Sequence, residues 1–138
     1  MYEQVAGLLG KSTTYSSELE SVGALLLGSA WGGVHAADTL PAPASALTCR
    51  VVNTASTNDG TNGVHWLACA EEAGQRYFND SLGDVGASQR RAIERRYPGA
   101  QWADMDAEQQ PSQRDCGVRA LVALIIARDC SVECFMDL

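Results

Sequence analysis

Cys116 stands where a thiol could act as a nucleophile. After it, apolar side chains recur at helical spacing and predict a helix buried nearly all round, with a main apolar face of Val118, Leu121, Val122, Ile125 and Ile126. Asp115 is a good N-cap residue, so Cys116 lies at or beside the first helical position. Unpaired backbone N–H groups and the helix dipole favour a thiolate there, and the same amides could stabilise an oxyanion. For Cys116 taken alone, a small buried structural residue is the competing interpretation.

A histidine and an aspartate upstream supply the rest of a catalytic set. Two strand-like runs end at Ala70 and begin at Gln75, with a turn-like four-residue segment between them. If that segment closes a hairpin with Ala70 opposite Gln75, then His65 lies opposite Asp80, on the same face, with Cβ atoms about 4.5–5.5 Å apart. A carboxylate beside an imidazole fixes its tautomer and supports the imidazolium formed when the ring takes a proton from a thiol. The pattern therefore predicts a nucleophile, a base and an orienting group.

Four groups of motifs follow one another along residues 51–128. They are Val52-Asn53-Thr54-Ala55, Gly63-Val64-His65-Trp66, Phe78 with Asp80-Ser81-Leu82-Gly83, and Gln110-Pro111 with Asp115-Cys116-Gly117. In this order they resemble the adenain-like and SUMO- and ubiquitin-like-specific cysteine peptidases. The resemblance implies four catalytic residues: His65 as general base, Asp80 as its partner, Cys116 as nucleophile and Gln110 as the side-chain donor of the oxyanion hole. Gln109 is the alternative donor, because adenain spaces its glutamine one residue further from the cysteine.

The resemblance also implies a fold and a reaction. The expected fold is α+β, adenain-like and papain-related: one domain over residues 1–138, with a small antiparallel or mixed sheet of about four strands packed against the Cys116 helix. The implied reaction is endoproteolysis after glycine or another small residue, through a thioester. The Asn-Thr-Ala and Gly-Val-His-Trp motifs and the small size of the chain favour a viral-type maturation protease. The alternatives are a deubiquitinating or deSUMOylating isopeptidase, a related acyltransferase, and a binding module that keeps the fold without turnover.

Two tryptophans are candidates for contact with the substrate. In the resembled family, the tryptophan after the catalytic histidine narrows the passage to the nucleophile, and Trp66 holds that position. Trp31 falls in a glycine-bearing segment, residues 29–38, which we expect to be a loop that walls the cleft. A place in the core or at its edge is the alternative for each tryptophan. His35, in the same segment, is expected to be a surface-loop histidine and not the base.

Composition and charge argue against several other classes. A formal charge of −7 disfavours nucleic-acid binding, which needs clustered Lys and Arg. The five cysteines and two histidines show no metal-ligand spacing, so neither a metal nor another cofactor is expected. No stretch reaches the roughly 18 apolar residues of a membrane span, and the start does not read as a signal peptide. The free thiolate indicates an intracellular, reducing compartment, in a host cell or a virion if the protein is viral, although Cys130 and Cys134 could pair.

The expected partners are a protein or peptide substrate and, as in adenain, an activating peptide. The activator of adenain is disulfide-bonded to a cysteine between the acidic and glutamine motifs. This chain has no cysteine from Asp80 to Arg114, which argues against that mode of attachment.

The remaining elements are predicted from periodicity and breakers. We expect helices over residues 2–9, 16–27 and 88–96, and strands over residues 47–53 and 101–106. Four arginines in the helix over residues 88–96 form the only basic cluster of the sequence. They indicate a solvated helix face, or alternatively a patch for an acidic substrate or partner.

Overall fold

The computed structural model describes residues 1–10, 16–54, 65–81, 87–103 and 115–138, and its centre is one five-stranded sheet. In sheet order the strands are β1 (Trp31–Ala36), β2 (Thr48–Asn53), β3 (Trp66–Glu72), β4 (Gln75–Asn79) and β5 (Gln101–Trp102). The β2–β3 and β3–β4 pairs are antiparallel, as the predicted meander requires, whereas the two outer pairs are parallel. An α+β fold with a mixed sheet is confirmed, and this sheet has one strand more than expected.

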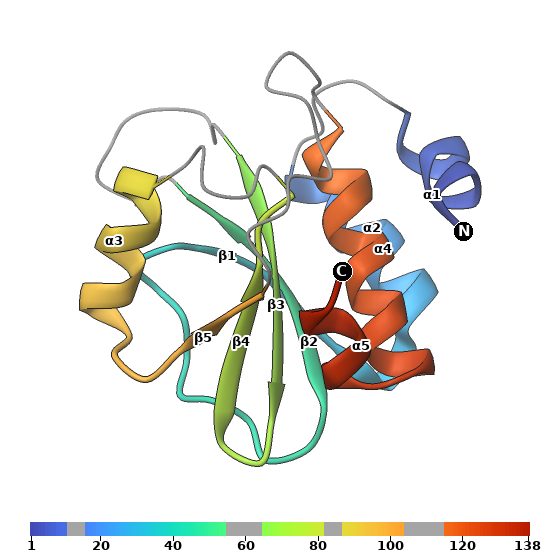
Figure 1. The fold of residues 1–138 in the computed structure, drawn as a ribbon. Helices are drawn as coiled ribbons and strands as arrows, with labels where there is room; N and C mark the ends of the chain where they lie inside the picture. Colours follow the sequence, from blue (N-terminus) through green and yellow to red (C-terminus); the bar gives the residue numbers. More distant parts are fainter. Residues whose placement is uncertain (11–15, 55–64, 82–86, 104–114) are drawn as a thin grey trace.

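Helices cover both faces of the sheet (Figure 1). One face carries α3 (Ala87–Arg96), and the other carries α1 (Tyr2–Leu9), α2 (Ser16–Leu27), α4 (Cys116–Asp129) and α5 (Val132–Met136). Successive strand residues point to opposite faces. Val51 and Ala68 therefore share a core with α4, while Val52 and Leu67 share a second core with Ile93 of α3. Burial on both faces explains why these strands are almost continuous apolar runs.

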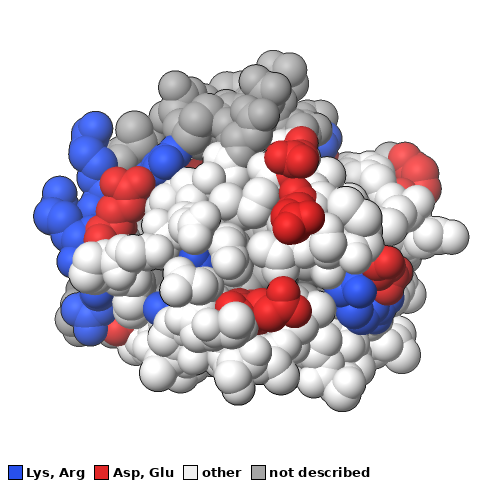
Figure 2. All heavy atoms as spheres, turned by 60° about the horizontal axis from the view of Figure 1, so that its bottom comes forward, with Lys and Arg blue, Asp and Glu red and all other residues white. Residues whose placement is uncertain are grey.

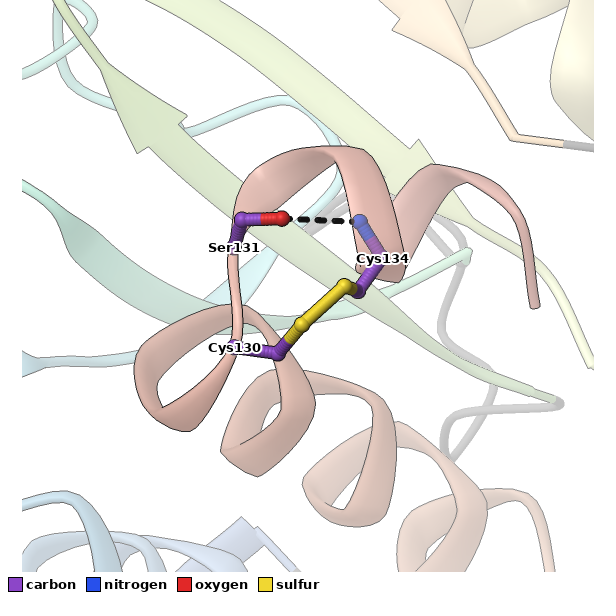
Figure 3. Close-up of a disulfide and its surroundings, with 3 residues drawn as sticks. All are labelled: Cys130, Ser131 and Cys134. Atoms are coloured by element: carbon purple, nitrogen blue, oxygen red, sulfur yellow. Dashed lines mark hydrogen bonds between the residues drawn. A yellow bond between two sulfur atoms is a disulfide. The ribbon is translucent and has the colours of Figure 1, made fainter.

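The helix that begins at Cys116 is the main helix of the larger core. Eight of the 14 residues of α4 are buried, and Val118, Leu121 and Leu124 have no exposed surface. Of the predicted apolar face, Val118, Leu121 and Ile125 are buried, whereas Val122 and Ile126 are half-buried. A short connection leads from α4 into α5. There, Cys130 and Cys134 form a disulfide, and the Cys134 N–H donates to Ser131 Oγ at 3.1 Å (Figure 3).

The hairpin between β3 and β4 has a different register from the predicted one. Ala70 pairs with Tyr77, and the turn consists of only Ala73 and Gly74, with φ angles of 54° and 76°. Positive φ at both central positions suits the twist of a two-residue hairpin. The predicted pairing of Ala70 with Gln75 is therefore wrong by two residues. Because side chains alternate with a period of two, a two-residue shift leaves every side chain on its predicted face.

Residues 29–38 are not the expected loop. After the short 3-10 turn η1 (Gly28–Ala30), β1 forms an edge strand parallel to β2. A Cβ atom at Gly32 would lie 2.5 Å from Thr48 Cγ2, so the glycine that suggested a loop permits close packing against β2. His35 is likewise not a surface-loop residue. It is half-buried, and its Nε2 lies 2.9 Å from Arg50 Nη1 and 3.1 Å from the Gly32 carbonyl.

The remaining helices follow the predicted pattern closely. α1, α2 and α3 match the predicted ranges to within one residue, and α2 stops at Gly28, which has a φ of 56°. On α3, Arg91, Arg95 and Arg96 are exposed, and Figure 2 shows basic side chains gathered at the left edge of the molecule, where α3 lies. This arrangement agrees with a solvated basic helix face, and a partner for that face stays a prediction.

Candidate active site

The three predicted catalytic side chains come from three elements that meet at one end of the sheet. His65 directly precedes β3, Asp80 directly follows β4, and Cys116 begins α4, all toward the top of Figure 1. His65 Nε2 lies 2.6 Å from Asp80 Oδ1, and the two side chains are only 9% and 8% exposed. The Cys116 side chain is near enough to His65 to raise the pKa of the ring, and its thiol is free and half-buried. The structure therefore brings nucleophile, base and carboxylate together.

Hydrogen bonds at the ends of the strands hold His65 and Asp80 in place. The His65 carbonyl accepts a hydrogen bond from Thr54 N at 3.0 Å, which extends the β2–β3 pairing by one residue. Asn79, the neighbour of Asp80, donates from Nδ2 to the Phe135 carbonyl of α5 at 3.2 Å. With the observed register, His65 and Asp80 are diagonal rather than directly opposed, yet they keep the same face and remain within reach of each other.

The charge state of His65 is set by its two partners. Burial alone would lower its pKa, but hydrogen bonds to Asp80 and Cys116, together with their negative charges, raise the pKa of His65 to about 9. Because Nε2 faces Asp80, Nδ1 is the ring nitrogen available to exchange a proton with Cys116. The ring is thus positively charged at neutral pH beside a free thiol, an arrangement that can form an ion pair with a thiolate and shuttle its proton.

Asp115 occupies the predicted N-cap position of α4 without capping the helix. Its side chain makes no bond to the amides of the first turn. The carboxylate instead accepts from the hydroxyl of Tyr2 and from Arg119 Nε, which lies 3.2 Å from both of its oxygens. A phenol and a guanidinium thus compete successfully for the carboxylate. The predicted N-cap position is confirmed, but the Asp115 side chain does not cap the helix, and the amides of the first turn are left clear of it.

The other predicted site residues do not join this group. Gln110 and the alternative Gln109 lie outside the described residues. Trp66 is only 6% exposed and packs in the core shared with α4, so its role in substrate binding stays a prediction. Trp31 of β1 pairs with Cys49 of β2. Cys49 lies five residues before Thr54, whose N–H bonds to the His65 carbonyl, so Trp31 and His65 are about 16 Å apart along the strand direction.

Two residues beside the site were missed by sequence reasoning. The i,i+4 spacing of Asp115 and Arg119 is a known helical ion-pair signal and could have indicated their contact. Tyr2 lies 113 residues from Asp115, and nothing local in the sequence links them. A cavity of about 240 Å³ opens nearby, between α1, α4 and the end of β4, with Tyr2, Asn79, Ser81 and Arg119 in its wall.

Among the described residues, no three or more His, Cys, Asp or Glu side chains are grouped to hold a metal ion. Within the same part of the chain, none of the helices has the length and apolar character needed to cross a membrane.

Comparison with known proteins adds no relative to this picture: no protein-family model matches the sequence, and no curated protein matches it significantly.

Proposed function

We propose that the protein is a cysteine peptidase with Cys116, His65 and Asp80 as its catalytic triad. One observation carries the proposal: a free thiol at a helix start, a buried imidazole and a carboxylate meet in the order nucleophile, base and orienter. A histidine paired with a carboxylate is common in cores that have no catalytic role. The additional contact to a half-buried cysteine at the start of α4 supports nucleophilic chemistry over that structural role.

The proposed reaction proceeds through a thioester. The Cys116 thiolate attacks the carbonyl carbon of the scissile bond, and the carbonyl electrons move onto oxygen. As the tetrahedral species collapses, the C–N bond breaks and the His65 imidazolium gives its proton to the leaving amine. A water molecule then attacks the thioester while His65 takes its proton, and the C–S bond breaks to release the acid and regenerate the thiolate. Asp80 holds the ring in place throughout.

The oxyanion needs two donors in this scheme. The backbone N–H of Cys116 is one candidate, since the Asp115 side chain does not bond to the first turn of α4. The side chain of Gln110 is the second candidate by family resemblance. A free nucleophilic thiol also supports the proposal of an intracellular, reducing compartment, where the Cys130–Cys134 disulfide would be open to reduction.

The substrate class follows from the motif resemblance. The proposed substrate is a protein or peptide with glycine or another small residue before the cut, in a viral-type maturation reaction. An isopeptidase that removes ubiquitin-like proteins is the alternative, and an acyltransferase would use the same triad. Cleavage of a viral structural precursor against cleavage of a tagged ubiquitin-like fusion separates the first two. Dependence on acetyl-CoA would identify the third.

The decisive experiment is a proteome-scale cleavage profile with matched cysteine variants. Cys116→Ala should abolish all cleavage. It should leave the temperature of thermal unfolding nearly unchanged, because the thiol is only half-buried and forms no disulfide. Cys49→Ala, which removes a buried free thiol elsewhere in the core, should keep cleavage in whatever fraction stays folded. An active Cys116→Ala protein, or a profile in which cuts follow bulky residues, would contradict the mechanism or the specificity respectively.

A further inference from the structure

A three-residue cluster around a buried carboxylate begins at the residue before the nucleophile. Asp115, the residue before Cys116, is 4% exposed and accepts hydrogen bonds from Tyr2 and Arg119. The Arg119 guanidinium also stacks over the Tyr2 ring, 5.2 Å from its centroid. Each member therefore contacts the other two. The cluster ties α1, at the beginning of the chain, to the first turn of α4.

The protonation states of the cluster are well defined at neutral pH. Burial alone would raise the pKa of Asp115, but the bonds from Tyr2 and Arg119 and the charge of Arg119 lower it below its ordinary value. Burial, and then the bond to Asp115, raise the pKa of Tyr2 to about 12. Tyr2 is thus a hydroxyl donor to an ionised carboxylate. Such charge-assisted bonds are short, directional and stronger than neutral ones.

We propose that Tyr2 and Arg119 are positioning residues that act on Cys116 through Asp115, an inference that rests on the proposed peptidase function. By fixing the Asp115 carboxylate, they hold the backbone turn that aims the Cys116 sulfur at His65. They also compensate a negative charge that would otherwise oppose a thiolate one residue away. Finally, they keep that carboxylate from capping α4, so the amides of its first turn stay available for an oxyanion.

The rate of Cys116 alkylation by iodoacetamide tests this role without any knowledge of the substrate. Tyr2→Phe removes the hydroxyl and keeps the ring under Arg119, so folding should be preserved. We expect the alkylation rate of Cys116 at pH 7 to fall about threefold to tenfold, the scale of one lost charge-assisted hydrogen bond acting on a neighbour. Cleavage by the same variant should fall in kcat with little change in KM.

Tyr97→Phe is the matched control. Tyr97 also carries an arginine over its ring, Arg76 at 4.9 Å, and its hydroxyl also makes a hydrogen bond, from Leu40 N at 3.0 Å. Its site lies beside the hairpin turn of β3 and β4, at the other end of the sheet from His65. We expect Tyr97→Phe to change thermal stability about as much as Tyr2→Phe does and to leave the Cys116 alkylation rate unchanged.

A second pair of variants tests the charge itself. Arg119→Lys keeps a cation near Asp115 and should restore much of the alkylation rate that Arg119→Met loses. If wild-type Cys116 is alkylated no faster than Cys49 and Cys69, the nucleophile assignment fails and the positioning role fails with it. If wild-type Cys116 is fast and stays equally fast in Tyr2→Phe and Arg119→Met, the positioning role alone is overturned.

Discussion

His65 carries a proton at neutral pH, because the contacts to Asp80 and Cys116 outweigh burial and raise its pKa to about 9. In a thiolate–imidazolium pair the first catalytic duty of the ring is therefore to act as an acid toward the leaving amine. The carboxylate of Asp80, 2.6 Å away, transfers no proton in this scheme. Its contribution is the orientation and the charge of the ring.

The pH dependence of cleavage should report this proton. In the wild-type protein we expect kcat/KM to fall through an alkaline limb near pH 9, where the imidazolium loses its proton. Asp80→Asn removes the negative charge and replaces a charge-assisted hydrogen bond to the ring with a weaker neutral one, so the His65 pKa and the limb should move down toward the ordinary value of 6.5. His65→Ala should lose far more activity than Asp80→Asn, because it removes the proton carrier. A limb that stays near pH 9 in Asp80→Asn would contradict the assignment of Asp80.

At the scale of elements, the sequence predicts the parts whose signal is local. The α4 helix, the meander and the end of α2 at Gly28 were all readable from periodicity and breakers. The hairpin register was not, because Glu71 reads as a turn residue. In the structure Glu71 lies inside β3, fully buried between Arg50 and Arg76. Arginines from the two neighbouring strands offset the cost of burying this charge, and a local pattern does not reveal them.

In the candidate site, too, local signals could be predicted and contacts made by tertiary packing could not. The residue types and order of His65, Asp80 and Cys116 were enough to predict their association, and a two-residue register error did not separate them. The contact of Tyr2 with Asp115 depends on how α1 docks against α4, which tertiary packing decides. The strand β1 was missed for a related reason, since Gly32 permits a close approach to β2 and does not mark a loop.

Two helical glycines give a test of packing between elements. A Cβ atom at Gly23 of α2 would lie 2.4–2.6 Å from three ring atoms of Trp31, whereas a Cβ atom at Gly7 of α1 would meet nothing within 4 Å. We expect Gly7→Ala to raise the free energy of unfolding by about 0.5–1 kcal/mol through helix propensity. Gly23→Ala should lower it by about 1–3 kcal/mol, because the indole must shift. Urea unfolding measures both, and equal effects would contradict the packing of Trp31 on α2.

At the scale of the whole molecule, two ends of the sheet carry different polar groups. The end with His65 holds the candidate catalytic residues, and the other end holds a structural network centred on Glu71. Glu71 accepts from Arg50 Nε at 3.0 Å, Arg76 Nε at 2.9 Å and the Ala44 backbone N–H at 3.2 Å. Arg76 also donates to the Pro41 carbonyl. One carboxylate thus joins β2, β3, β4 and the connection before β2.

The two ends of the sheet should act separately, the Glu71 end on stability and the His65 end on the reactivity of Cys116. Glu71→Gln removes the buried charge that Arg50 and Arg76 share, and breaking a buried ion pair from one side costs about 3–5 kcal/mol. We therefore expect a loss of that size in the free energy of unfolding in urea. Glu72→Gln changes the exposed neighbour and should stay within about 0.5 kcal/mol of the wild type. Because the network lies at the far end of the sheet, folded Glu71→Gln protein should keep the wild-type rate of Cys116 alkylation. Wild-type stability in Glu71→Gln would show that the network is dispensable, and a slowed Cys116 in the folded variant would show that the two ends are coupled.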